Sequence, residues 1–125
     1  MAMSCVVTHS KTRRVKAVIW TWTSAADGSA GADSPAISGE IVRVVSNPGA
    51  TAPTAAWDFV INDADGFDVC AGKGANRSAT ATEAFCPLTG DGTTTNQRFA
   101  VDGVLTLAVT NAGDTKDGVI TLYYI

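Results

Sequence analysis

The chain has little of the chemistry that catalytic and metal sites use. It has one histidine, His9, and three cysteines in 125 residues, and no two cysteines have the Cys-x-x-Cys spacing of zinc sites. His9 has no acidic or cysteine neighbour at the spacing of a ligand set or a catalytic triad, so we interpret it as a surface histidine. The acids and bases form no recognisable catalytic constellation. We therefore expect a protein that is not an enzyme and binds no metal or cofactor.

Long apolar runs are also missing. Residues 15–22 are too few to cross a bilayer and include Lys16. The first seven residues do not resemble a signal peptide, because the positive charges follow the apolar residues instead of preceding them. We expect a soluble protein that is made in the cytosol and has no membrane partner.

Charge is scarce as well. Charged residues make up 17% of the chain, and the net charge is −3. The acidic balance argues against generic or sequence-specific nucleic-acid binding, which favours a basic face. A low charge fraction suits a protein that covers much of its surface with partners, including copies of itself. A Ser- and Thr-rich monomer would have a similar composition.

No segment of helix length shows an apolar period of 3.6 residues, whereas period-two patterns recur. In residues 103–110, Leu105, Leu107 and Val109 point to one face of a strand, and Val104, Thr106, Ala108 and Thr110 point to the other. About seven short strands separated by turn signals predict an all-β protein with a single domain, either a β-sandwich or a jelly-roll-like barrel. We assign residues 1–11 to an N-terminal arm, with a short first strand as the alternative, and residues 12–125 to the β domain.

Two hairpins are predicted. Residues 57–62 and 67–71 are strand candidates on either side of the turn Asp63-Ala64-Asp65-Gly66, and the second pair closes the chain after residue 103. The Asp-rich turn resembles the start of a calcium loop, but it lacks the later ligands. Asp and Gly are favoured in turns for their own conformational reasons, so we interpret it as a turn. Residues 25–38 are predicted to be an exposed loop.

Four cations lie close together where the longest strand candidate, residues 12–24, begins. They are Lys11, Arg13, Arg14 and Lys16. One interpretation is a solvated strand start that protects a sheet edge. The other is a contact with an acidic partner. Lys73 and Arg77 lie in a Gly-rich segment, residues 72–78, that we expect to protrude and to be available for contacts. This segment lacks the phosphate-loop pattern GxxxxGK[ST].

Trp20 and Trp22 share one face of the strand candidate 12–24. Because both faces of this strand carry apolar groups, it is either central in its sheet or covered by another chain. The two side chains belong to the core, to a subunit interface or to a ligand platform. Cys5, Cys70 and Cys86 cannot all pair within one chain, and we expect buried free thiols, with an intermolecular disulfide through Cys5 as a lesser possibility.

Several segments resemble small structural proteins of tailed bacteriophages. They are residues 37–44 followed by Asn47-Pro48-Gly49, and residues 57–69, 71–78 and 105–113. The resemblance covers most of the chain from Trp20 onward. Proteins of this kind are encoded near capsid and head-to-tail connector genes. The shared patterns are turns and strands, so the resemblance assigns no role to any residue.

The resemblance implies a non-enzymatic virion protein that is made in the host cytoplasm. The leading expectation is a head decoration or cement protein that binds the major capsid protein, or another virion protein, as a small homo-oligomer. The alternatives are a head-to-tail connector, a tail component or a fibre-anchoring component. A third reading, independent of the resemblance, is a carbohydrate-binding β-sandwich module that uses Trp20 and Trp22. A β fold is compatible with all of them.

Overall fold

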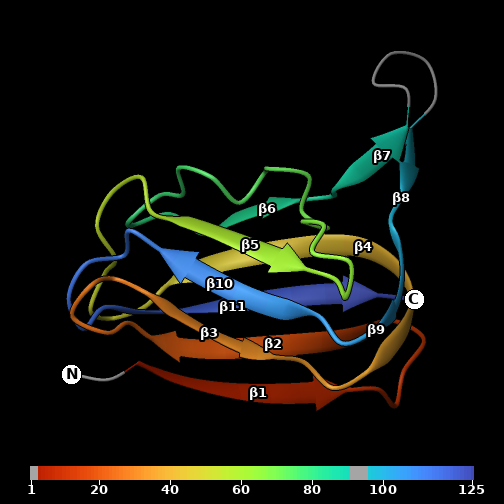
Figure 1. Cartoon of the computed structure of the whole chain (residues 1–125), viewed down its shortest axis with the longest axis horizontal. Helices are drawn as coiled ribbons and strands as arrows, with labels where there is room; N and C mark the ends of the chain where they lie inside the picture. Colours follow the sequence, from red (N-terminus) through yellow and green to blue (C-terminus); the bar gives the residue numbers. More distant parts are fainter. Residues whose placement is uncertain (1–2, 91–95) are drawn as a thin grey trace.

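A computed structural model of the chain describes residues 3–90 and 96–125. Within these ranges there are eleven strands and no helix (Figure 1). The strands are β1 (Ser4–Ser10), β2 (Lys16–Thr23), β3 (Ala30–Asp33), β4 (Ile37–Pro48), β5 (Asp58–Asn62), β6 (Glu83–Phe85), β7 (Leu88–Gly90), β8 (Asn96–Arg98), β9 (Ala100–Gly103), β10 (Thr106–Thr110) and β11 (Asp117–Tyr124). The all-β prediction is confirmed. Among the described residues, no helix exists that could cross a membrane.

The largest sheet is antiparallel and curls into a half-barrel. Its order is β1-β2-β11-β4-β6, and β9 pairs with the other end of β4. A three-stranded sheet, β3-β10-β5, lies over the concave face of the large sheet, and a two-stranded ribbon, β7-β8, projects from one corner (Figure 1). The strand predicted over residues 12–24 is therefore central, as one of its two interpretations required, because β2 pairs with both β1 and β11.

The core fills the space between the two larger sheets. It consists of the inward-facing residues of the strands, because successive side chains of a strand point to opposite faces of its sheet. Fully buried side chains from the large sheet include Trp20, Ile41 and Leu122, and those from the small sheet include Phe59 and Leu107. Burial of apolar side chains from both sheets holds the two layers face to face.

The count of about seven strands is too low. β3, β6, β7, β8 and β9 are three or four residues long. Their sequences, such as Asn-Gln-Arg in β8, carry no apolar alternation that sequence reasoning could use. For the same reason, the predicted loop 25–38 contains β3, where Ala30 is buried. β3 pairs with the longer strand β10, and β6 and β9 pair with the longer strand β4, whereas β7 and β8 pair with each other.

The predicted C-terminal hairpin is wrong in its pairing. Both strands exist, but β10 pairs with β3 and β5, whereas β11 pairs with β2 and β4. The connection between them crosses from one sheet to the other. Ala112, in the middle of that connection, is fully buried, and its amide donates to the carbonyl of Gly28. Sequence periodicity gives the faces of each strand but does not give the strand's partner.

The hairpin predicted from residues 57–62 and 67–71 is also corrected. Residues 67–71 form turns, with one isolated bridge between Asn62 and Asp68. The Asp68 carboxylate accepts hydrogen bonds from the amides of Ile61, Cys70 and Gly72. This side chain therefore satisfies backbone donors that a partner strand would otherwise pair. The turn at residues 63–66 is present, because the Asp63 carboxylate accepts from two amides of the loop.

The arm assigned to residues 1–11 is replaced by strand over its described part. Residues 4–10 form β1, which pairs with β2 along its whole length. Cys5 and Val7 pack against the core from this strand. Their burial favours docking on the sheet over a free arm, which agrees with the alternative of a short first strand.

Candidate functional site

A basic turn connects β1 to β2 at the right of Figure 1, close to the C-terminus. Lys11, Arg13 and Arg14 are all exposed in this turn. Within residues 3–90 and 96–125 the ion pairs are Arg77–Glu83 and Arg98–Glu40, so these three cations form no internal pair. They are available to an external anion or acidic surface.

Lys16 differs from the other three predicted cations. It is half-buried at the start of β2, and its ammonium lies 5.5 Å from the centre of the Tyr124 ring. Its Nζ atom also lies 3.5 Å from the carbonyl oxygen of Arg14. A cation over an aromatic face is stabilised by the ring quadrupole. Lys16 therefore anchors the turn to the sheet and contributes less than its neighbours to any external contact.

An apolar hollow lies beside the basic turn, on the convex face of the large sheet. Val15, Val42, Arg43 and Tyr123 line it, and its volume is about 450 Å³. Val15 is 50% exposed, and the Arg43 guanidinium lies 5.4 Å from the centre of the Tyr123 ring. The hollow and the turn together form what we call the basic corner: Lys11, Arg13, Arg14, Val15, Val42, Arg43 and Tyr123.

The basic corner combines the three exposed cations of the turn, none of which has an ion-pair partner among the described residues, with Arg43 and an apolar floor. Such a surface fits a partner segment that carries acidic and apolar side chains together. Sequence reasoning identified the cations but not Val42, Arg43 or Tyr123. Those residues reach the turn only because β4 and β11 are neighbours, with Arg43 opposite Tyr123 in the register. No signal in the sequence gives that pairing.

The segment that contains Lys73 and Arg77 does not protrude as predicted. Its backbone runs along the free side of β5, where the amide of Phe59 donates to the carbonyl of Gly74 and the amide of Arg77 donates to the carbonyl of Trp57. The amide of Asn76 donates to the Asp58 carboxylate at 2.9 Å. The segment therefore serves as a cover for the edge of β5.

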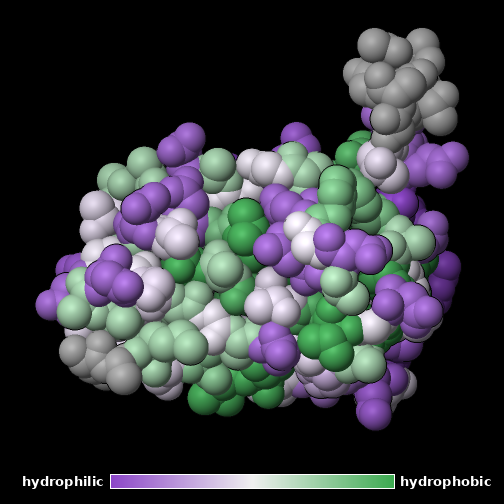
Figure 2. Space-filling view, viewed as in Figure 1, coloured by the Kyte–Doolittle hydropathy of each residue, from purple (hydrophilic) through white to green (hydrophobic). Residues whose placement is uncertain are grey.

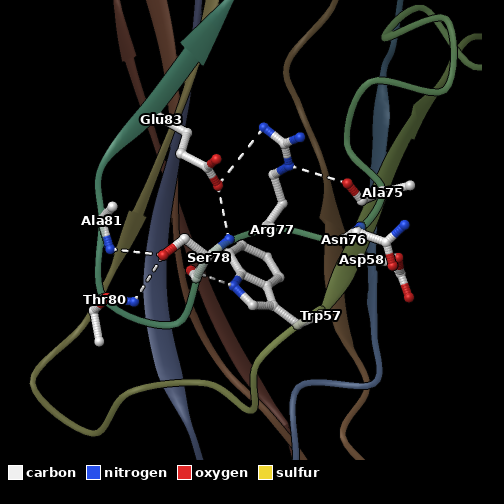
Figure 3. Close-up of polar contacts among 9 residues, drawn as sticks. All are labelled: Trp57, Asp58, Ala75, Asn76, Arg77, Ser78, Thr80, Ala81 and Glu83. Carbon is white, nitrogen blue, oxygen red and sulfur yellow. Dashed lines mark hydrogen bonds and ion pairs between the residues drawn. The ribbon is translucent and has the colours of Figure 1, made fainter.

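Side chains hold this cover in place (Figure 3). The Trp57 indole donates to the carbonyl of Ser78 at 3.0 Å, and Glu83 accepts from the amide of Ser78 at 2.7 Å. The Arg77 guanidinium lies 3.7 Å from the same Glu83 oxygen, 5.8 Å from the centre of the Phe85 ring, and is 19% exposed. Arg77 is therefore a structural residue of this network, and the prediction that it is available for contacts is wrong. Lys73 is exposed.

Trp20 and Trp22 face the core. Both are fully buried, as is Trp57, and Trp57 packs against Trp22 with ring centres 5.2 Å apart. The Trp20 indole donates to the carbonyl of Ala32 at 3.1 Å. Of the three alternatives, only the core fits these positions, so neither Trp20 nor Trp22 is retained as an interface or platform residue. The carbohydrate-binding alternative thereby loses the aromatic side chains on which it depended.

The three cysteines are free thiols in three different environments. Cys70 is buried, Cys5 is half-buried on β1, and Cys86 is exposed. Burial raises the pKa of the Cys70 thiol far above its usual range, and the nearby Asp68 carboxylate adds to this effect. Burial also raises the pKa of Cys5. Thiols with raised pKa values are poor nucleophiles and metal ligands. Among the described residues, no three His, Cys, Asp or Glu side chains lie together as a metal site would require.

Comparison with known proteins gives no match of any kind: no family model, no curated protein and no solved structure is similar enough to this chain to count as one.

Proposed function

We propose that this chain is a non-enzymatic structural protein of a bacteriophage virion, and that it decorates or cements the head by binding the capsid surface as a small homo-oligomer. The observation that carries the proposal is the basic corner. The three exposed cations of its turn have no ion-pair partner within residues 3–90 and 96–125, and they border an apolar hollow on the large sheet. The segments that resemble tailed-phage proteins set the partner class, which is the major capsid protein or another virion protein.

The proposed mechanism is physical and involves no covalent step. An acidic patch of the capsid would meet Lys11, Arg13 and Arg14, while apolar side chains would enter the hollow beside Val15. Charge complementarity speeds and orients docking, and buried apolar area supplies affinity. Each bound copy would add contact area to the shell and so help it to resist the pressure of packaged DNA.

The fold suits this role. We interpret the two larger sheets as a β-sandwich, because the small sheet covers the concave face of the large one and the core lies between them. A sandwich of this kind presents its turns and its convex face on a frame of paired strands. In this proposal the protein is made in the host cytoplasm and ends in the virion.

The first experiment asks whether the chain is part of the particle. Virions of the phage that encodes it would be purified, analysed by mass spectrometry and labelled with an antibody for electron microscopy. We expect the chain in stoichiometric amounts, with label over the head shell. Label at the head-to-tail junction or on the tail would support the connector alternative instead. Absence of the chain from purified virions would overturn the proposal.

The second experiment tests the basic corner with two variants that change the net charge equally. Arg13→Glu reverses an exposed charge in the corner, and Lys73→Glu reverses an exposed charge on the cover of β5. Binding to particles that lack the protein would be measured by co-sedimentation at several salt concentrations. We expect Arg13→Glu to weaken binding about tenfold and to reduce its salt dependence, whereas Lys73→Glu binds as wild type does. Equal loss in both variants would count against the corner.

A further inference from the structure

Strand β1 is a bare edge of the large sheet. It pairs with β2 through seven consecutive residue pairs, from Ser4 opposite Thr23 to Ser10 opposite Ala17. In the part of the chain that the structure describes, no strand pairs with its other side. One edge of a seven-residue strand therefore presents backbone groups to solvent.

The other edges are protected. The Gly-rich segment, residues 72–78, covers β5 through backbone hydrogen bonds to Trp57 and Phe59. The strands β6, β7 and β8 have three residues each, and β9 has four. β3 also has four residues and ends in the exposed Asp33. Short strands, covering loops and charged residues are the means by which β proteins prevent edge-to-edge association.

β1 carries none of these protections. Its sequence, Ser-Cys-Val-Val-Thr-His-Ser, has no Lys, Arg, Asp, Glu or Pro, and its pairing with β2 has no bulge. Val6 points to the convex face and is 61% exposed. In Figure 2, hydrophobic residues gather along the lower rim, where Figure 1 shows β1. A long, regular and uncharged edge is a template for another strand.

The charges at the two ends of β1 are opposite in sign. Lys11, Arg13 and Arg14 follow its last residue. At its beginning, Met3 and Ser29 line a second hollow, separate from that of the basic corner. The Ser29 hydroxyl donates to the exposed carboxylate of Asp27 at 2.6 Å. That hydrogen bond lowers the pKa of Asp27, so the carboxylate is charged at neutral pH. Antiparallel pairing of two β1 strands would bring each basic turn to the end where the other copy has Asp27, whereas parallel pairing would bring like charges together.

We propose that β1 pairs antiparallel with β1 of a second copy of this chain, so that the two large sheets become one continuous sheet. A two-fold axis at Val7 uses all seven strand residues. It places Val6 opposite Thr8 of the other copy and Cys5 opposite His9. Such an interface is self-complementary, as a two-fold axis requires. A shift of one residue would turn the side chains of one copy to the opposite face.

This inference rests on the proposed function only for the expectation that the chain assembles with itself. Its physical basis is the edge, the absence of edge protection and the charge arrangement. Because the contact is mostly backbone pairing with charged ends, we expect a dimer that depends on protein concentration and weakens as salt screens the Asp27 contacts.

The test uses sedimentation velocity of the purified full chain over a range of concentrations. Val6→Lys combined with Thr8→Lys puts like charges opposite each other across the proposed axis. We expect this variant to weaken dimerisation by at least about tenfold. Val6→Lys combined with Thr8→Glu puts opposite charges at the same positions and should restore the dimer. Ala81→Lys combined with Ala84→Lys adds two charges at exposed positions in and just before β6, at the opposite end of the large sheet from β1, and should dimerise as wild type does.

Cysteine crosslinking provides a readout that does not depend on added charge. In a background with Cys5→Ser and Cys86→Ser, mild oxidation should join two copies through Val7→Cys, because directly opposite side chains are about 5 Å apart. Thr8→Cys should not crosslink to itself, because it lies opposite Val6. Circular dichroism and tryptophan emission would check the fold of every variant.

Two results would overturn the inference: a wild-type chain that stays monomeric at every concentration, or an oligomer that Val6→Lys with Thr8→Lys leaves unchanged and Val7→Cys does not crosslink. Because no phage particle is present in these measurements, such a result would leave particle binding standing. Conversely, a chain absent from virions could still form this dimer.

Discussion

His9 on β1 and Tyr124 on β11 are joined across β2, the strand that separates theirs. The imidazole Nε2 and the phenol hydroxyl are hydrogen-bonded, and the rings are stacked with centres 6.0 Å apart and planes 23° apart. The contact lies on the concave side of the sheet and ties the edge strand to the centre of the fold. It gives His9, which sequence reasoning interpreted as a surface residue, a structural partner.

Tyr124→Phe removes the hydroxyl and keeps the ring. We expect the free energy of unfolding to fall by about 1 kcal/mol, the usual contribution of one hydrogen bond, because His9 loses its partner while the packing is kept. Urea denaturation followed by tryptophan fluorescence measures this change. Tyr123→Phe is the matched control. Tyr123 lies on the convex face, so this variant should change the free energy of unfolding little. Equal effects at the two positions would argue against a specific role for the His9 contact.

Trp20→Phe and Trp22→Phe test the same core with and without a hydrogen bond. Both indoles are fully buried, but Trp20 donates to the carbonyl of Ala32, whereas the Nε1 of Trp22 has no partner among the described residues. Each variant loses similar volume. We expect Trp20→Phe to cost about 1 kcal/mol more, because it leaves a carbonyl unpaired, while Trp22→Phe removes an unpaired donor. Thermal and urea unfolding of both variants gives the difference. A larger cost for Trp22→Phe would contradict the argument.

Arg77→Ala should destabilise the cover of β5. The guanidinium pairs with Glu83, lies over Phe85 and donates to the carbonyl of Ala75 at 3.2 Å. We expect a loss of about 1–2 kcal/mol in the free energy of unfolding, and faster proteolysis within residues 71–82. Lys73→Ala, on an exposed neighbour in the same segment, should stay within about 0.5 kcal/mol of wild type. If the two variants behave alike, Arg77 does not hold the cover.

The buried thiol of Cys70 predicts a loss of stability at alkaline pH. In the unfolded chain the thiol has a pKa of about 8.5, whereas burial raises its pKa in the folded protein. The folded state therefore holds a proton that the unfolded state has lost. Stability is unaffected below about pH 8.5 and falls as the pH rises above it, by up to about 1.4 kcal/mol per pH unit.

Urea denaturation at a series of pH values, for wild type and Cys70→Ala, tests this slope. The variant has a lower stability at neutral pH, since it loses buried volume, but its decline between about pH 8.5 and 10 should be shallower. Above about pH 10 both proteins should decline further, because burial also raises the pKa of Tyr124. Identical slopes below pH 10 would show that Cys70 does not ionise on unfolding in this range.

The sequence by itself determined the class of the fold and the faces of its long strands. Alternation placed Leu105, Leu107 and Val109 on one face of a strand, and in the structure all three are buried. The Asp63–Gly66 turn followed from local conformational preference. These features depend on neighbours within a few residues, so the linear pattern contains them.

Only the tertiary structure decided which strands pair and which charged groups remain free. Arg77 and Arg13 look alike in the sequence, yet Arg77 is enclosed by Glu83 and Phe85, whereas Arg13 forms no ion pair with any residue that the structure describes. β10 and β11 follow each other in the chain and belong to different sheets. The physical reason is that pairing and burial are set by contacts between residues far apart in sequence, and alternation is the same whichever strand becomes the neighbour.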